Sequence, residues 1–99
     1  MTTFQKICSV VSNIPDGKVS TYKQVADRVG LKNPRIVGFA LHKNNNPKAI
    51  PCHRVIKSDG TIAKGYAFGG FNKQKEKLEK EGVKFLSPFK VDLNRCLHK

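Results

Sequence analysis

The sequence predicts a mostly α-helical domain with a small β-hairpin, of the winged-helix-like helix-turn-helix type. Two observations predict the helices. Apolar residues recur at helical spacing over residues 4–42, and a turn at residues 30–33 ends in an Asn-Pro helix-start signal. The third observation is Asp59-Gly60, a hairpin turn signal. Since 99 residues provide one modest core, we expect a single domain over residues 1–99 and exclude a two-domain enzyme.

The first helix is expected at residues 4–14, before a turn at residues 15–18 that stops it. The second is expected at residues 22–29, capped by Ser20 or Thr21 and closed by Gly30. The apolar stripe of the first helix consists of Phe4, Ile7, Val11 and Ile14, with Thr2 and Thr3 as possible caps.

A third helix is expected from Pro34 to His42. Asn33 can accept hydrogen bonds from the free backbone N–H groups at the start of a helix. Pro34 has no backbone N–H, but at the first helical position that group would have no partner within the helix. The pair of helices matches a helix-turn-helix, but such pairs also occur in helical proteins that bind no DNA. The pattern therefore leaves both interpretations open. The expected inward stripe consists of Ile36, Val37, Ala40 and Leu41.

The second half of the chain is expected to contain a hairpin, a loop and one helix. Residues 55–63 give the hairpin signal and residues 65–70 read as a loop. A last helix is predicted over residues 73–81, capped by Asn72, ended by Gly82 and anchored by Leu78. Residues 83–99 are expected to pack over the core.

The chain is strongly basic, with 19 Lys and Arg against 7 Asp and Glu and a net charge of +12. Such a charge favours a polyanionic partner, first nucleic acid and second an anionic membrane surface. A basic surface that only keeps the protein in solution is the alternative, and the charge does not decide between them. No apolar run is long enough to span a bilayer, and residues 1–6 resemble no targeting peptide. We therefore expect a cytoplasmic protein, nuclear in a eukaryote, with no membrane partner.

The three cysteines, Cys8, Cys52 and Cys96, are too few and too scattered for a disulfide scaffold and indicate a reducing compartment. No C-x-x-C or H-x-x-x-H spacing occurs, so we predict no metal site. Cys52 is the candidate nucleophile because it follows a proline in a loop, whereas Cys8 fits a helix edge or core and Cys96 the tail. His53 could lower the pKa of the Cys52 thiol only if the chain turns there, because neighbours in a strand point to opposite faces.

The segment Ile50-Pro51-Cys52-His53-Arg54-Val55-Ile56 resembles the active-site motif of the O6-alkylguanine-DNA alkyltransferases, also called methylated-DNA–protein-cysteine methyltransferases. The resemblance covers residues 4–85 and continues in residues 20–26, residues 35–38, the Asn44 loop and residues 65–82.

The resemblance implies that the chain binds double-stranded DNA containing O6-alkylguanine, as a monomer and without a cofactor. It implies that the damaged base is flipped out and that its alkyl group moves irreversibly to Cys52, once per molecule. Because His53 and Glu81 match the family's histidine and glutamate, they are expected to assist Cys52 through a bridging water.

The resemblance also implies residues that bind DNA and substrate. Arg35 matches the arginine finger that enters the vacated stack, with a phosphate contact or a solvated side chain as the alternative. Tyr22 matches the tyrosine that turns the nucleotide, with a half-buried helix aromatic as the alternative. Gly38 lies in the matching recognition helix, and Asn44 matches the asparagine that braces the active-site turn.

The expected guanine pocket is lined by Pro51, Cys52 and Val55, and the carbonyl groups of Cys52 and Val55 match those that recognise the exocyclic amine. Arg54 is expected to tie the active-site loop or to reach a phosphate. Phe68 lies where some members have a serine that approaches O6, so only a backbone contact is retained there and the preference for alkyl groups stays open.

Two other functions stay open. Short alkyltransferase-like members of the family replace the cysteine with Trp or Ala and only flag the lesion; Cys52 argues against that class but does not exclude a damage sensor. A generic DNA-binding protein with an inert Cys52 is the third possibility. Many alkyltransferases carry an N-terminal domain, sometimes with zinc, and those roles are not carried over to this chain.

Overall fold

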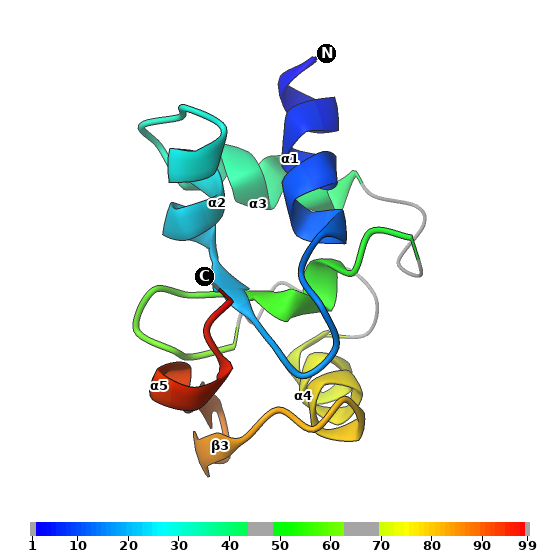
Figure 1. Cartoon of the computed structure of the whole chain (residues 1–99), viewed down its shortest axis with the longest axis vertical. Coiled ribbons are helices and arrows are strands. Elements are labelled where there is room, and N and C mark those ends of the chain that lie inside the picture. Colours follow the sequence, from blue (N-terminus) through cyan, green and yellow to red (C-terminus); the bar gives the residue numbers. More distant parts are fainter. Residues whose placement is uncertain (1, 44–48, 63–69, 99) are drawn as a thin grey trace.

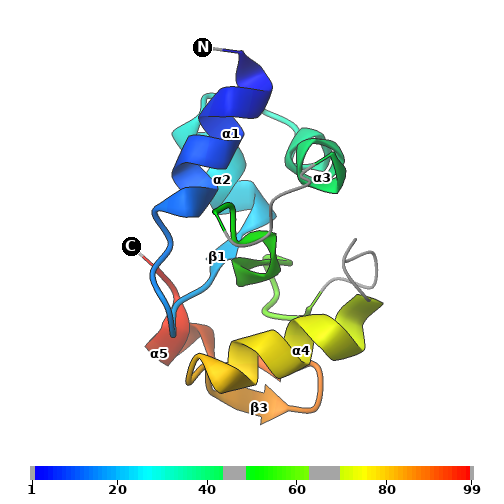
Figure 2. The same ribbon diagram turned by 90° about the vertical axis from the view of Figure 1, so that its right-hand side faces the viewer.

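The computed structural model describes residues 2–43, 49–62 and 70–98, so the expected site residues Asn44 and Phe68 lie outside the described residues. Three helices form one half of the molecule, and a long helix, a hairpin and a short helix form the other (Figure 1). Figure 2 shows the short strand β1 between the two halves. The elements in chain order are α1 (Thr3–Ser12), β1 (Ser20–Thr21), α2 (Tyr22–Arg28), α3 (Arg35–His42), the 3₁₀ helix η1 (Cys52–Arg54), β2 (Val55–Ile56), α4 (Gly70–Lys80), β3 (Phe85–Ser87), β4 (Lys90–Val91) and α5 (Leu93–Cys96).

Side-chain caps start the first two helices. Thr2 and Gln5 form a capping box, in which each backbone N–H donates to the other residue's side chain. At α2 the Gln24 N–H donates to the Thr21 hydroxyl at 3.0 Å, which confirms Thr21, rather than Ser20, as the cap. The Ser20 hydroxyl instead donates to the Gln24 side chain.

The third helix follows the predicted turn. Gly30 has a φ of 78°, the left-handed conformation expected after α2. The Asn33 side chain accepts the Arg35 N–H at 3.0 Å, and α3 begins at Arg35 rather than at Pro34. The predicted helix-turn-helix is therefore present in α2 and α3.

The first core lies between α1, α2, α3 and η1. The predicted stripe of the first helix is confirmed at Ile7 and Val11, and Phe4 is half-buried; Ile14 is buried too, but it follows the end of α1, which stops at Ser12, earlier than predicted. The prediction for Ile36 is wrong: its side chain is 39% exposed because it lies on the flank of α3, about 100° around the helix from Val37. The buried members are Ile7, Val11, Ile14, Val25, Ala26, Val37, Ala40, Leu41, Cys52 and Val55.

The second core joins β2, α4 and the C-terminal segment. Leu78 is fully buried there, as predicted for the anchor of the last helix. That helix begins at Gly70, earlier than expected, and Gly82 follows its end with a φ of 88°. The buried members are Val19, Ile56, Ile62, Leu78, Val83, Val91 and Cys96.

The prediction of a hairpin at residues 55–63 is wrong. β2 pairs in parallel with β1, and the antiparallel hairpin is formed by β3 and β4. In a half-exposed hairpin strand, buried and exposed side chains would alternate. Val55 and Ile56 are instead both fully buried, and consecutive buried residues are typical of parallel strands. Asp59-Gly60 does form a turn, in which the Gly60 N–H donates to the Lys57 carbonyl.

The C-terminal segment is part of the fold, as expected, but Cys96 is not an ordinary tail thiol. Cys96 is 4% exposed, and its sulfur accepts the Lys84 N–H at 3.3 Å. Its carbonyl accepts the Val19 N–H, and the Val19 carbonyl accepts the His98 N–H. The segment therefore continues the small sheet beside the start of β1. No helix of the described residues is long and apolar enough to cross a bilayer.

Candidate functional site

The chain turns at Cys52, as cooperation with His53 requires. The Cys52 N–H donates to the Ile50 carbonyl at 2.7 Å, and the Arg54 N–H donates to the Pro51 carbonyl at 2.9 Å. These bonds wind residues 52–54 into η1 rather than a strand. Cys52 and His53 are each 5% exposed, so the thiol and the imidazole share one buried turn.

The Arg54 guanidinium fastens this turn to two distant segments. Nη1 donates to the Ile14 carbonyl at 2.7 Å, after the end of α1, and Nη2 donates to the Asp16 carboxylate. Nε donates to Glu81 Oε1 at 2.8 Å and Nη2 to Glu81 Oε2 at 2.6 Å, after the end of α4. Arg54 therefore ties the active-site loop, one of its two expected roles.

Glu81 decides which ring nitrogen of His53 carries hydrogen. Its Oε2 lies 2.9 Å from His53 Nε2. Burial alone would raise the pKa of Glu81, but hydrogen bonds from Arg54 and His53 outweigh this effect and hold the pKa below its ordinary value. Because the ionised carboxylate can only accept, Nε2 must be the donor.

His53 is therefore a neutral base with one free nitrogen. Burial lowers the pKa of His53, although the hydrogen bond to Glu81 opposes this shift. In a neutral ring with hydrogen on Nε2, Nδ1 keeps a lone pair. Nδ1 is buried and makes no hydrogen bond with the described residues. A proton acceptor thus lies in the same turn as the Cys52 thiol.

Gln74 is a site residue that the sequence analysis missed. It is 1% exposed on α4, and its Nε2 donates to the carbonyls of His53 at 3.0 Å and Val55 at 3.2 Å. The available signal was helical spacing, since Gln74, Leu78 and Glu81 recur on one face at intervals of four and three residues. Asp16 was likewise assigned only to a turn.

Tyr22 connects the buried thiol to the surface of the helix-turn-helix. Burial, and then the negative charge of a Cys52 thiolate, raise the pKa of Tyr22 to about 12, so its hydroxyl stays protonated at neutral pH. Burial and the same thiolate charge raise the pKa of Cys8. Tyr22 also lines a surface hollow of about 360 Å³ with Pro34, Arg35, Gly38, Phe39 and His42.

The structure brings the expected residues together in two groups. Cys52, His53 and Glu81 meet around η1, and Tyr22, Arg35 and Gly38 meet around the hollow beside α3. Pro51 and Val55 are buried on either side of η1. Within residues 2–43, 49–62 and 70–98, no group of three or more His, Cys, Asp or Glu side chains could hold a metal ion.

Comparison with known proteins gives the family of this fold and site. Residues 2–83 match the family model described as "6-O-methylguanine DNA methyltransferase, DNA binding domain". The chain belongs to this family. The methylated-DNA–protein-cysteine methyltransferase of Methanothermobacter thermautotrophicus is 49% identical over 79 residues, which are 80% of this chain and 43% of that protein. The chain thus spans less than half of that methyltransferase.

A relative from Schizosaccharomyces pombe matches this chain over nearly its full length. Alkyltransferase-like protein 1 of Schizosaccharomyces pombe is 39% identical over 101 residues, covering 97% of this chain and 94% of that protein. The crystal structure of S. pombe Atl1 with damaged DNA containing O6-carboxymethylguanine superposes with a TM-score of 0.87 at 37% identity, covering 98% and 94% of the two chains. Mycobacterium tuberculosis OGT in complex with DNA gives a TM-score of 0.76 at 34% identity, covering 83% of this chain and 49% of that one.

Replacing Arg54 with alanine should destabilise the fold by about 2 kcal/mol, because Glu81 loses its main partner in a largely buried setting. Urea denaturation measures this change. Arg54→Lys should recover only part of the loss, since an ammonium group cannot bond Glu81, Asp16 and Ile14 as the planar guanidinium does.

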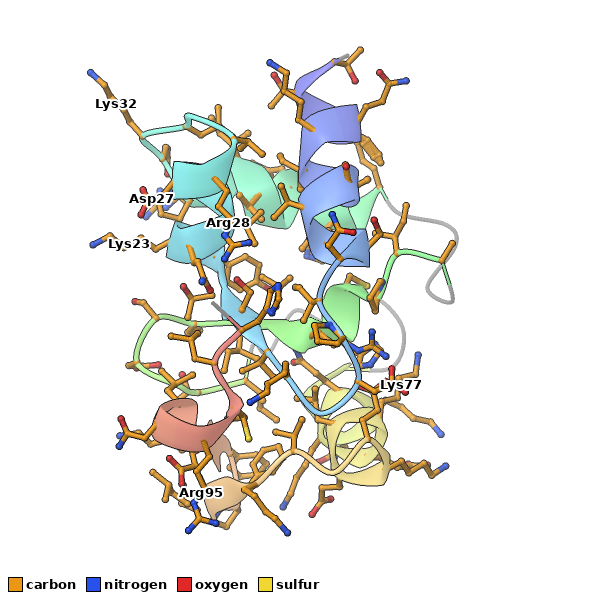
Figure 3. The ribbon with its side chains drawn as sticks, in the orientation of Figure 1. Lys23, Asp27, Arg28, Lys32, Lys77 and Arg95 are labelled. Atoms are coloured by element: carbon orange, nitrogen blue, oxygen red, sulfur yellow. The ribbon has the colours of Figure 1, made fainter. Side chains whose placement is uncertain are left out.

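Arg95→Ala is the matched control, because Arg95 forms an exposed ion pair with Asp92 at 3.7 Å and projects from the lower end of the molecule (Figure 3). Its removal should cost about 0.5 kcal/mol or less. Equal losses for Arg54→Ala and Arg95→Ala would contradict the anchoring role of Arg54.

Proposed function

We propose that this chain repairs DNA directly, by irreversible transfer of an alkyl group from O6-alkylguanine to Cys52, one group per molecule. The observation that carries the proposal is the buried turn of Cys52 and His53, in which Glu81 holds His53 with a free Nδ1. A thiol needs such a base to become a nucleophilic thiolate. The family membership is consistent with this chemistry.

The transfer is a single displacement. Nδ1 of His53 takes the thiol proton, through a bridging water, while Glu81 stabilises the resulting imidazolium. The Cys52 sulfur attacks the alkyl carbon, an S–C bond forms, and the bond between that carbon and O6 breaks. The proton then returns to the leaving guanine, so a neutral base and a thioether remain. No dissociable cofactor takes part.

The pocket around the thiol recognises the flipped guanine. Pro51 and Val55 supply its walls. The carbonyl groups of Cys52 and Val55 are proposed to receive the exocyclic amine of the guanine. In the structure the Cys52 carbonyl accepts the Val55 N–H, and the Val55 carbonyl accepts Gln74 Nε2. Asn44 and Phe68 are proposed to complete the site.

DNA binding is assigned to the outward face of the helix-turn-helix. Tyr22 and Arg35 line the hollow beside α3, where they are proposed to turn the nucleotide out and to fill the vacated stack. Lys23 and Lys32 project from the α2 side of this unit, and we assign them to phosphate contacts (Figure 3). The chain is proposed to act as a monomeric single domain in the cytoplasm, or in the nucleus of a eukaryote.

Lesion recognition without transfer is the second candidate function. The observation that favours it is the near full-length match to S. pombe alkyltransferase-like protein 1. Cys52 favours transfer, because a protein that only binds the lesion has no chemical need for a thiol beside a neutral histidine. Reactivity of Cys52 separates the two functions.

The decisive experiment is the intact mass of the protein after incubation with a duplex containing O6-methylguanine. We expect the mass of the wild-type chain to increase by one methyl group, once per molecule. Cys52→Ser and an undamaged duplex should give no increase, and Cys8→Ser should react like the wild type. Selective binding of the damaged duplex without a mass increase would establish the second candidate function instead.

The transfer rate should depend on the protonation of His53. Because burial holds the pKa of His53 below its ordinary value of about 6.5, Nδ1 is free at neutral pH, and the rate should fall only as the pH drops below about 6.5. The unfolded chain takes up this proton more readily, so the free energy of unfolding should decrease in the same direction. Single-turnover rates at saturating duplex measure the first effect without interference from DNA affinity.

His53→Gln should react slowly and without this pH step, while binding the duplex normally. A variant that retains the pH step would show that a group other than His53 controls the transfer rate.

Gly38→Ala should stabilise the free protein but weaken its DNA binding. A Cβ at this position in α3 would meet nothing within 4 Å, so alanine should add about 0.5–1 kcal/mol of helix stability. The same methyl group faces the hollow and should separate the helix from DNA, which we expect to weaken binding about tenfold. Urea denaturation and duplex titration test the two effects, and unchanged DNA affinity would contradict the assigned interface.

A further inference from the structure

Phe39 is an aromatic side chain whose position the fold does not explain. It is 68% exposed, more than any other large apolar side chain among the described residues. It lies in the middle of α3, whose buried face is formed by Val37, Ala40 and Leu41. Phe39 is also not an isolated apolar residue on a flat surface, because it lines a hollow together with Tyr22 and Pro34, and a partner can fill such a hollow.

The neighbours of Phe39 indicate which partner it contacts. Arg35 lies four residues before it, and both side chains line the same hollow. Between them lies Gly38, where an added Cβ would meet no atom within 4 Å, so packing within the protein does not require a glycine there. Ile36, 39% exposed, extends the apolar surface on the flank of α3.

We propose that Phe39 packs as an apolar wedge against the sugars and base edges of the DNA groove, one helical turn from Arg35. This inference rests on the proposed DNA binding by α3. Four residues of helix rise about 6 Å, which is close to two steps of about 3.4 Å along a DNA strand. Phe39 therefore contacts the duplex about two base pairs from the nucleotide that is turned out, and holds the groove open there.

The surroundings favour DNA over a protein as the occupant. Exposed cations occur throughout the helix-turn-helix: Lys23 on α2, Lys32 in the turn before α3 and Lys43 directly after α3, in a chain of net charge +12. One aromatic ring and part of Ile36 form a small apolar surface within this basic region. Protein interfaces have larger apolar centres, whereas minor-groove proteins combine cations with single apolar wedges.

The test is the affinity of each variant for a fluorescent duplex with one O6-methylguanine, measured by anisotropy at several salt concentrations. Phe39→Ala should weaken binding about tenfold, the loss expected when a buried phenylalanine contact is removed. The dependence of affinity on salt should stay as in the wild type, because no cation is lost.

Leu86→Ala is the matched control. Leu86 is 64% exposed on β3, in the opposite half of the molecule from α3 (Figure 1), and its removal should change affinity less than twofold. Phe39→Lys is the second variant: an interface that contacts only phosphates would bind more tightly with the added charge, while a wedge predicts weaker binding. Unfolding midpoints equal to that of the wild type show that the variants fold.

The inference is overturned if Phe39→Ala binds like the wild type, if it weakens binding no more than Leu86→Ala does, or if Phe39→Lys binds more tightly. These outcomes differ from a failure of the proposed function. A wild-type chain that binds duplex but never gains a methyl group refutes transfer and leaves the Phe39 measurement valid, whereas a wild-type chain that binds no duplex refutes both.

Discussion

The guanidinium group of Arg54 holds the turn of Cys52 and His53 in place. A charged group this close to the core is stable only when its hydrogen-bonding capacity is used, and Arg54 uses it on Ile14, Asp16 and Glu81. These partners come from segments on either side of η1, so the turn cannot shift without breaking several charged hydrogen bonds. The position of Glu81 then fixes the ring of His53, and the ring fixes the available nitrogen.

The site lies where the two cores meet. Cys52 and Val55 belong to the first core, and Ile56 belongs to the second. Gln74 on α4 donates to the carbonyl groups of His53 and Val55, on either side of Arg54. The turn that carries Cys52 is therefore held by packing and by polar bonds.

Local signals in the sequence predicted the local structure well. The left-handed Gly30 was predicted from its neighbours, and each cap was narrowed to two adjacent residues, of which the structure selects Thr2 and Thr21. The parallel pairing of β1 with β2 and the burial of Cys96 depend on segments far apart in the chain, and no short sequence motif predicts them.

The residues of the candidate site likewise divide into those that the sequence predicted and those that it did not. The candidate residues Cys52, His53 and Glu81 came from the motif and its resemblance to a family, and the structure places them together. The motif left the function of Arg54 open between the loop and a phosphate, and Gln74 carried no signal beyond its helical spacing. By contrast, Gly38 and Phe39 depart from what a helix favours. Gly38 is a flexible residue in the interior of α3, and Phe39 is an aromatic residue exposed on its surface. Such departures are expected where function outweighs stability.

The tautomer of His53 is the most direct test of this account. Nitrogen-15 NMR of labelled histidine distinguishes a ring nitrogen that carries hydrogen from one with a free lone pair, and His53→Gln assigns the signals. At pH 7 we expect hydrogen on Nε2, facing Glu81, and a free lone pair on Nδ1. Hydrogen on Nδ1, or a doubly protonated ring at this pH, would contradict the account, because His53 could then accept no proton from the Cys52 thiol.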